Sequence, residues 1–202
     1  MKVTARNLSL VQVLPVLYLV LGALGFIAAF ALTYDKIHVI ANPHYVPNCN
    51  INPILSCGSV MKTQQASLFG VPNTIFGLIG FTALGTLGIV MLTGSKLNRK
   101  LWLGVQAGVT VGVVFMHYLF FQGVFRIHAI CPWCSVVWLV TIPTFWYTTL
   151  YSLELFRDSL HGKLKTMAIF LRRYHGDGLG VWYLIIFAIL ILKFWYYWKT
   201  LL

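Results

Sequence analysis

The chain has 202 residues, of which 59% are hydrophobic and only 9% are charged. In a soluble domain about a quarter of the residues are charged. This composition excludes a soluble globular protein, and the mean hydropathy of +0.81 agrees. The formal net charge of +11 does not point to nucleic acid, because the basic residues lie mainly between apolar stretches. The sequence therefore predicts an all-α polytopic membrane protein.

Five apolar stretches are each long enough to cross the roughly 30 Å hydrocarbon core of a bilayer. In chain order, helices are predicted at about residues 10–33, 74–92, 101–121, 130–150 and 179–198. The first stretch is too long for a signal peptide and is expected to remain as a spanning helix. We treat the chain as one membrane domain, with the bundle at about 10–152 and an additional helix at about 179–198, expected to lie outside the functional bundle.

The loop over residues 35–72 is rich in Pro and Asn, but its segment 59–69 contains neither Pro nor Gly and predicts a short surface helix. Glycines recur in two of the spanning stretches, at Gly77, Gly80, Gly85 and Gly88, and at Gly104, Gly108 and Gly112. Such small residues let neighbouring helix backbones approach closely, so we interpret both sets as helix-packing positions.

Basic residues are distributed unequally between the two sides of the predicted bundle. With the N-terminus in the cytoplasm, ten lie on that side and five on the other. The ten are Lys2, Arg6, Lys96, Arg99, Lys100, Arg157, Lys163, Lys165, Arg172 and Arg173, and the five are Lys36, Lys62, Arg126, Lys193 and Lys199. This asymmetry follows the positive-inside rule. It predicts a multi-pass protein of the inner or plasma membrane with the 35–72 loop on the outer face and anionic lipid head groups as contacts.

The four cysteines form two pairs that this topology places at the outer face, where disulfides persist. Cys49 and Cys57 lie in the loop, and the other pair opens the fourth predicted helix as Cys131-Pro132-Trp133-Cys134. A helix N-terminus stabilises a thiolate, and proline is tolerated in the first helical turn. Thiol–disulfide exchange would then pass electrons between the pairs, and Cys134, one turn deeper, could deliver them to a lipid-soluble quinone.

Two other interpretations of the cysteines remain open. The pairs could be structural disulfides, or the four thiolates could hold a structural zinc ion. The wide spacing of the loop pair and the membrane-edge position of the other pair disfavour zinc, so no metal is expected.

The ordered motifs resemble those of the vitamin K epoxide reductase family in its prokaryotic form, over about residues 10–152. The resemblance rests on Cys49, Ser56-Cys57-Gly58-Ser59-Val60, the run Leu68-Phe69-Gly70-Val71-Pro72-Asn73-Thr74-Ile75-Phe76-Gly77, and Cys131-Pro132-Trp133-Cys134. It implies a four-helix bundle around a quinone, capped by the first outer loop, with a fifth helix. One prokaryotic form carries a thioredoxin-like domain after that helix. We expect no such domain here, so the resemblance implies a separate thioredoxin-like or DsbA-like carrier.

The resemblance also implies roles for individual residues. Cys49 would accept electrons from the carrier, Cys57 would pass them to Cys131, and Cys134 would reduce the quinone. Asn73 matches an asparagine that binds a quinone carbonyl, although its position after a proline equally suits a helix N-cap. Trp138 stands where vertebrate members have a tyrosine. Because an indole donates but does not accept a hydrogen bond, this change disfavours epoxide reduction and leaves quinone reduction.

Three further residue types near the predicted site have ordinary packing explanations. His117 lies inside the third predicted helix, where an ionisable group is a functional candidate, but a neutral, hydrogen-bonded packing histidine is favoured. Met61, Phe69 and Phe76 would line the ring site or simply pack.

The sequence thus predicts a quinone-dependent, disulfide-generating oxidoreductase, reducing ubiquinone, menaquinone or a related ring and binding no nucleic acid. Three alternatives stay open. They are a non-enzymatic channel or transporter stapled by disulfides, a vitamin K epoxide or quinone reductase proper, and an unrelated quinone-linked thiol oxidase of the bacterial Dsb type. No polar stripe supports the channel, and the Dsb-type enzymes place their two cysteine pairs in the reverse order.

Overall fold

The computed structural model describes residues 6–68, 70–95, 97–159 and 161–199. It divides into two compact units, residues 1–148 and 149–202. Across the described residues, five helices are long and apolar enough to cross a membrane, which confirms the predicted all-α polytopic architecture. Apart from helices, the described backbone contains one isolated β-bridge, between Leu55 and Ile130.

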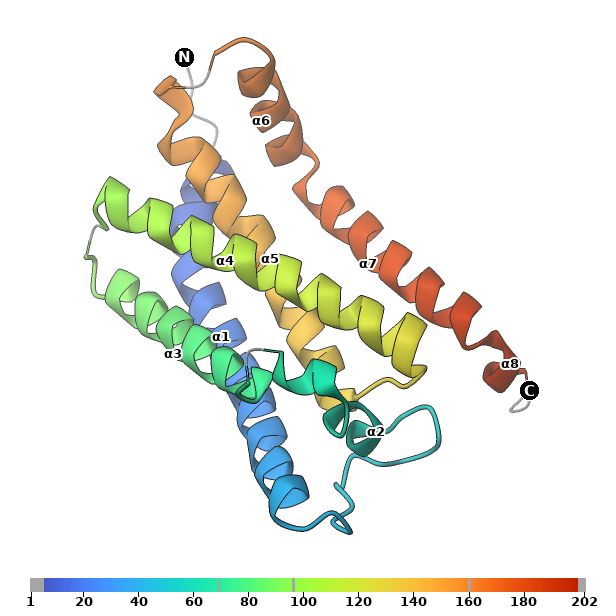
Figure 1. Cartoon of the computed structure of the whole chain (residues 1–202). Helices are drawn as coiled ribbons and strands as arrows, with labels where there is room; N and C mark the ends of the chain where they lie inside the picture. Colours follow the sequence, from blue (N-terminus) through green and yellow to red (C-terminus); the bar gives the residue numbers. More distant parts are fainter. Residues whose placement is uncertain (1–5, 69, 96, 160, 200–202) are drawn as a thin grey trace. The chain divides into compact units, whose positions relative to one another are not determined.

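The first unit holds four long helices, which Figure 1 labels α1, α3, α4 and α5. Their bounds are α1 Arg6–Ala41, α3 Asn73–Leu92, α4 Arg99–Phe121 and α5 Pro132–Leu155, the last of which continues into the second unit. The second unit contains the 3₁₀ turn Arg157–Ser159, α6 Lys163–Arg173, α7 His175–Lys193 and α8 Trp195–Trp198. The predicted fifth helix therefore begins earlier than expected, and its last residues form the separate α8.

Helix α1 is longer than predicted, because it continues past Thr33 to Ala41. The segment 34–41 contains no proline or glycine, and the first breaker is Pro43. Asp35 and Lys36 were predicted to open the loop, but they lie in the last turns of the helix. The expected loop at 35–72 is thus a shorter α1–α3 loop, residues 42–72.

The α1–α3 loop contains two short helical pieces in place of the single helix predicted at 59–69. These are α2 Cys57–Met61 and the 3₁₀ turn η1 Gln64–Ser67, while Phe69 lies outside the described residues. At this break, the Met61 carbonyl, which a continuing helix would pair with the amide of Gln65, accepts a hydrogen bond from the Lys36 amine.

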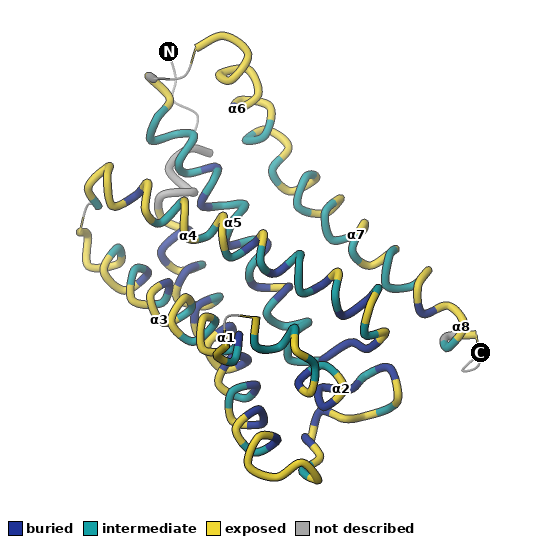
Figure 2. Tube along the Cα trace, viewed as in Figure 1, coloured by how far each residue is buried: buried dark blue, intermediate teal, exposed yellow. Residues whose placement is uncertain are grey.

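Two sets of contacts hold the first unit together. Helices α1 and α3 approach at their glycines, where a Cβ built on Gly22 would lie 2.7 Å from the backbone nitrogen of Gly85. Among α1, α4 and α5, Tyr18 shares a 2.7 Å hydrogen bond with Thr148 and stacks on Trp102 at 6.4 Å. Figure 2 shows that α3 remains largely exposed, as expected of a surface that lipid would cover.

A sharp reversal after α4 brings the second cysteine pair beside the α1–α3 loop. Helix α4 ends in a π-helical turn, η2 Gln122–Ile127, followed by His128 in the left-handed conformation at φ 57°. Backbone bonds then join Ile130 to the loop, since its N–H donates to Ile54 at 2.7 Å and its carbonyl accepts from Ser56 at 3.0 Å. The loop is therefore fixed to the residue preceding Cys131.

Candidate active site

The loop cysteines are joined to each other. Cys49 and Cys57 form a disulfide with Cα atoms 5.6 Å apart. Cys57 is the first residue of α2, whose N-terminus is capped by the Ser56 side chain. The side-chain oxygen Oδ1 of Asn50 accepts further bonds from the Gly58 N–H at 2.8 Å and the Ser56 hydroxyl at 3.1 Å. These bonds fix the position of the Cys57 sulfur, which is completely buried.

The second pair carries free thiols, and one of them contacts the disulfide. Cys131 directly precedes α5 and is 2% exposed, whereas Cys134 in the first turn is half-buried. The Cys131 sulfur lies 3.0 Å from the Cys57 sulfur. Reacting atoms at about 3–3.5 Å are in a near-attack arrangement. Cys57 and Cys131, which are 74 positions apart in the sequence, are thus placed for thiol–disulfide exchange.

The surroundings of Cys131 favour its thiolate form. Its pKa is lowered from the ordinary value, chiefly by a hydrogen bond from the Cys134 side chain and further by the backbone N–H groups of Cys134 and Trp133. Burial and the charge of Asp35 act in the opposite direction. The backbone N–H groups at the helix start act in the direction expected from the sequence, but the Cys134 side chain has the larger effect on the pKa of Cys131.

Two charged residues of α1 contact the α1–α3 loop, and the sequence interpretation missed both. Asp35 and Lys36 are 7% and 8% exposed. The Asp35 carboxylate accepts a 2.9 Å hydrogen bond from Tyr45 and lies 3.7 Å from the Cys49 sulfur. Adjacent ionisable residues near the end of an apolar helix are functional candidates by default, and this signal could have identified them.

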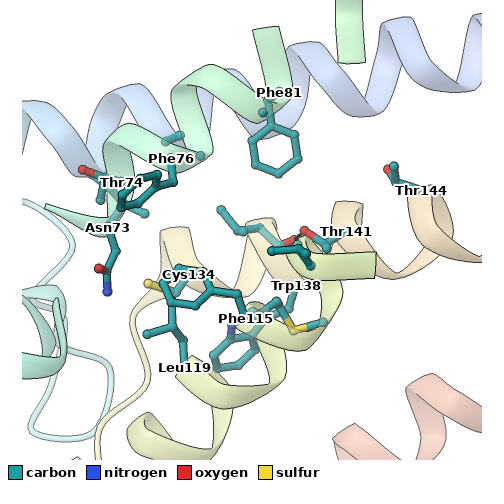
Figure 3. A pocket seen from close by; sticks show the side chains of 18 of the residues that line it. Asn73, Thr74, Phe76, Phe81, Phe115, Leu119, Cys134, Trp138, Thr141 and Thr144 are labelled. Atoms are coloured by element: carbon teal, nitrogen blue, oxygen red, sulfur yellow. Dashed lines mark hydrogen bonds between the residues drawn. The ribbon is translucent and has the colours of Figure 1, made fainter. Parts of the chain in front are cut away.

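A cavity of about 800 Å³ lies in the first unit between α3, α4 and α5. Its size is in the range of small-molecule sites. Figure 3 shows Cys134 and Asn73 toward one end of it and Thr144 toward the other. Its lining is mostly apolar and includes Met61, Phe76, Phe81, Leu84, Phe115, Met116, Leu119, Val137 and Trp138. Polar atoms are few, and the hydroxyls of Thr141 and Thr144 donate to carbonyls of their own helix.

Asn73 lines the cavity but does not cap α3. The helix begins at Asn73 itself, and the capping position belongs to Pro72, which provides no side-chain bond. The N-cap alternative is therefore wrong. The Asn73 amide instead holds the loop, because its oxygen accepts from the Leu68 N–H at 3.0 Å and its nitrogen donates to the Gln65 carbonyl at 2.6 Å. One amide hydrogen remains for another acceptor.

Of the other predicted residues, Trp138, Met61 and Phe76 line the cavity, whereas His117 does not. Trp138 lies one turn after Cys134, is buried, lines the cavity and packs edge-on against Phe120 at 4.9 Å. Met61 and Phe76 also line the cavity. His117 does not belong to the described lining, and its Nδ1 donates to the Val113 carbonyl at 2.8 Å. This bond supports the packing interpretation of His117.

The glycines of α4 do not serve helix packing, in contrast to the prediction. A Cβ built on Gly104, Gly108 or Gly112 would meet no atom within 4 Å, and all three glycines line the cavity. They widen the cavity along the helix. In α3, the packing prediction is correct for Gly88, where a Cβ would lie 2.8 Å from backbone atoms of α1. It is wrong for Gly80, where a Cβ would meet no atom within 4 Å and the residue lines the cavity.

Comparison with known proteins agrees with the geometry. The family model of the vitamin K epoxide reductase family matches residues 16–149. No curated protein matches the chain. The matched residues contain both cysteine pairs, Asp35 and every residue that lines the cavity. Within the described residues, no group of three or more side chains is arranged to hold a metal ion.

Proposed function

The chain belongs to the vitamin K epoxide reductase family, and from this premise we propose that it is a thiol:quinone oxidoreductase that generates disulfides outside the cytoplasm. Family membership together with five apolar helices makes it a multi-pass membrane oxidoreductase with redox-active cysteines. The proposal adds the electron donor, the acceptor and the route between them.

One observation carries the proposal. The Cys57 sulfur lies 3.0 Å from Cys131, and Cys134 lines the cavity, so the sulfurs form a continuous path from the loop to an apolar chamber. A thioredoxin-like carrier dithiol would reduce the Cys49–Cys57 disulfide. Cys57 would then attack Cys131 of an oxidised Cys131–Cys134 pair, and Cys49 would close the loop disulfide again. The arrangement described above, with the loop pair oxidised and the helix pair reduced, corresponds to the state after this exchange.

The final step transfers two electrons and two protons from the Cys131 and Cys134 thiols to a quinone, which leaves as quinol. The cavity suits this substrate, because a flat apolar ring needs apolar walls and few polar groups for its carbonyls. We assign Asn73 and Trp138 to the ring site, each through an N–H donor. Ubiquinone, menaquinone and related quinones share this chemistry. We further propose that the whole chain acts as one membrane domain in the plasma membrane, with the cysteines at the outer face.

The decisive experiment uses the purified protein with a reduced thioredoxin-like carrier and short-chain ubiquinone and menaquinone analogues, following quinol formation and carrier oxidation together. The wild-type protein should couple the two reactions. Cys134→Ser should abolish quinol formation yet still exchange disulfides with the carrier, while Ser135→Ala serves as the neighbouring control with normal turnover. Quinol formation by Cys134→Ser at the wild-type rate would overturn the proposed route.

A further inference from the structure

The side chain of Asp35 is a buried carboxylate beside the loop disulfide. It is 7% exposed, and its Oδ2 lies 3.7 Å from the Cys49 sulfur. In the disulfide this sulfur carries no proton, so the contact is not a hydrogen bond in the oxidised state. Once Cys49 is a thiol, its S–H faces the carboxylate oxygen. Catalytic contacts that are long in a resting state commonly shorten when the reaction partner is present.

The titratable groups around Asp35 come from the loop, from α1 and from the residue before α5. Tyr45 of the loop donates a hydrogen bond to Oδ1, and this bond to the Asp35 carboxylate is the main reason that the pKa of Tyr45 is raised. The neighbouring Lys36 directs its amine to the Met61 carbonyl. The charge of Asp35 also acts on Cys131, and the His38 ring lies 5.2 Å from that of Tyr45.

The relay requires Cys49 to lose a proton inside the protein. Only a thiolate attacks a disulfide, and an ordinary cysteine with a pKa of about 8.5 is mostly protonated at neutral pH. Cys49 is 7% exposed and Cys57 is completely buried, so bulk solvent reaches this sulfur poorly. A base within the protein could remove the proton in place of solvent, and Asp35 contacts the Cys49 sulfur.

We propose that the Asp35 carboxylate is the general base that deprotonates Cys49 when Cys49 closes the loop disulfide, an inference that rests on the proposed relay. In this step the Cys49–Cys57 bond forms and the Cys57–Cys131 bond breaks. The electron pair of the broken bond remains on the Cys131 sulfur, and the proton of Cys49 moves to Asp35 Oδ2. The step isomerises a disulfide, so it needs no external oxidant.

The leaving side of this reaction fits the assignment. A thiol with a lower pKa leaves faster in disulfide exchange, and the pKa of Cys131 is lowered by the hydrogen bond from Cys134 and by backbone N–H groups. The two ends of the step thus have complementary surroundings, a carboxylate for the sulfur that loses a proton and hydrogen-bond donors for the sulfur that gains charge.

Two other roles for Asp35 predict different results. If its charge only repels the Cys49 thiolate, Asp35→Asn increases the thiolate fraction and accelerates closure. If it only holds the loop through Tyr45, Asp35→Asn slows closure by the same factor at every pH. A lost general base instead slows closure at neutral pH and is compensated at alkaline pH, where Cys49 ionises unaided.

The test isolates the closing step in the full-length Cys134→Ser protein, which needs neither carrier nor quinone. In this protein the disulfide exchanges between Cys49–Cys57 and Cys57–Cys131. After a pH jump, samples are quenched with acid and alkylated, and peptide mass spectrometry gives the ratio of labelled Cys49 to labelled Cys131. The same measurement is made with Asp35→Asn, Asp35→Glu and Lys36→Met added. The last variant is the control, because it removes a buried loop contact without touching the proposed base.

At about pH 7, Asp35→Asn should slow the relaxation by about 100-fold, the low end of general-base effects, and approach the parent rate at about pH 9 or above. Asp35→Glu should restore part of the rate. Any slowing caused by Lys36→Met should be the same at neutral and at alkaline pH. Unchanged or faster relaxation in Asp35→Asn, a deficit equal at all pH values, or absence of the Cys57–Cys131 isomer would each overturn the inference. Failure of the wild-type protein to reduce quinone would refute the proposed function separately.

Discussion

At the scale of single residues, reactivity at this site depends on the hydrogen-bond donors nearest each sulfur. Cys131 is 2% exposed, and burial alone would raise its pKa. The Cys134 side chain and two backbone N–H groups reverse that effect, so the pKa is lowered overall. The order of the motif matters for this reason, because the first cysteine receives the N–H groups of the helix start.

Replacing Cys134 should raise the pKa of Cys131 only where the substitute has no hydrogen-bond donor. Cys134→Ala removes the side-chain donor, so the Cys131 pKa should rise and alkylation should begin at a higher pH. Cys134→Ser keeps a hydroxyl donor and should retain a lowered pKa. Iodoacetamide rates measured against pH, with the loop disulfide intact, give the two midpoints. Coincident midpoints would mean that the Cys134 donor does not control the Cys131 thiolate.

Asn73 joins the loop to the cavity, and its two functions are separable. Asn73→Ala removes bonds to Leu68 and Gln65, each of which contributes about 1 kcal/mol to stability. It should therefore lower the thermal unfolding midpoint and also raise the KM for quinone.

Gly70→Ala is the matched control for this prediction. Gly70 has φ +77°, a conformation that strains any residue with a Cβ, in the same loop and outside the cavity lining. This variant should lower stability and leave the KM unchanged. A raised KM in both variants would assign the effect of Asn73 to the loop and not to quinone contact.

At the scale of helices, glycine has two opposite uses in the first unit. Gly22 of α1 and Gly88 of α3 allow close backbone contact, while the glycines of α4 leave open space that belongs to the cavity. The sequence shows the same residue in both helices, and only its neighbours distinguish the uses.

Alanine substitutions should separate these uses. Gly88→Ala places a Cβ 2.8 Å from backbone atoms of Leu19 and Pro15, so it should destabilise the protein by about 1–3 kcal/mol. Gly108→Ala meets no neighbour and should leave stability unchanged or raise it slightly. Thermal unfolding in the same detergent compares the two variants. Equal losses of stability would contradict the distinction between packing glycines and cavity glycines.

At the scale of the whole molecule, the ten-to-five distribution of basic residues predicts the orientation in the membrane. Single cysteines at exposed loop positions test it in a background without native cysteines. Val46→Cys, where Val46 is 66% exposed in the α1–α3 loop, should react with an impermeant maleimide in intact cells. Ser95→Cys, in the α3–α4 connection, should react only after permeabilisation. The reverse pattern would place the redox site on the cytoplasmic side.

The sequence by itself determined the features that depend on local composition and spacing. Five long apolar stretches predicted the five helices, since each must satisfy its own backbone hydrogen bonds in lipid. The CxxC motif at a helix start predicted a stabilised thiolate, because its donors are sequence neighbours. The extension of α1 to Ala41 was also within reach, since no breaker precedes Pro43.

Only the tertiary structure decided which distant groups meet. The 3.0 Å approach of Cys131 to Cys57 depends on the reversal after α4 and the bonds of Ile130 to the loop. The positions of Asp35 beside Cys49 and of the α4 glycines along the cavity depend in the same way on packing between helices. Periodicity records which face of a helix is apolar, but a protein in lipid is apolar on the faces that meet other helices, the cavity and the bilayer alike. For that reason the pattern could not distinguish these surroundings, and the packed structure did.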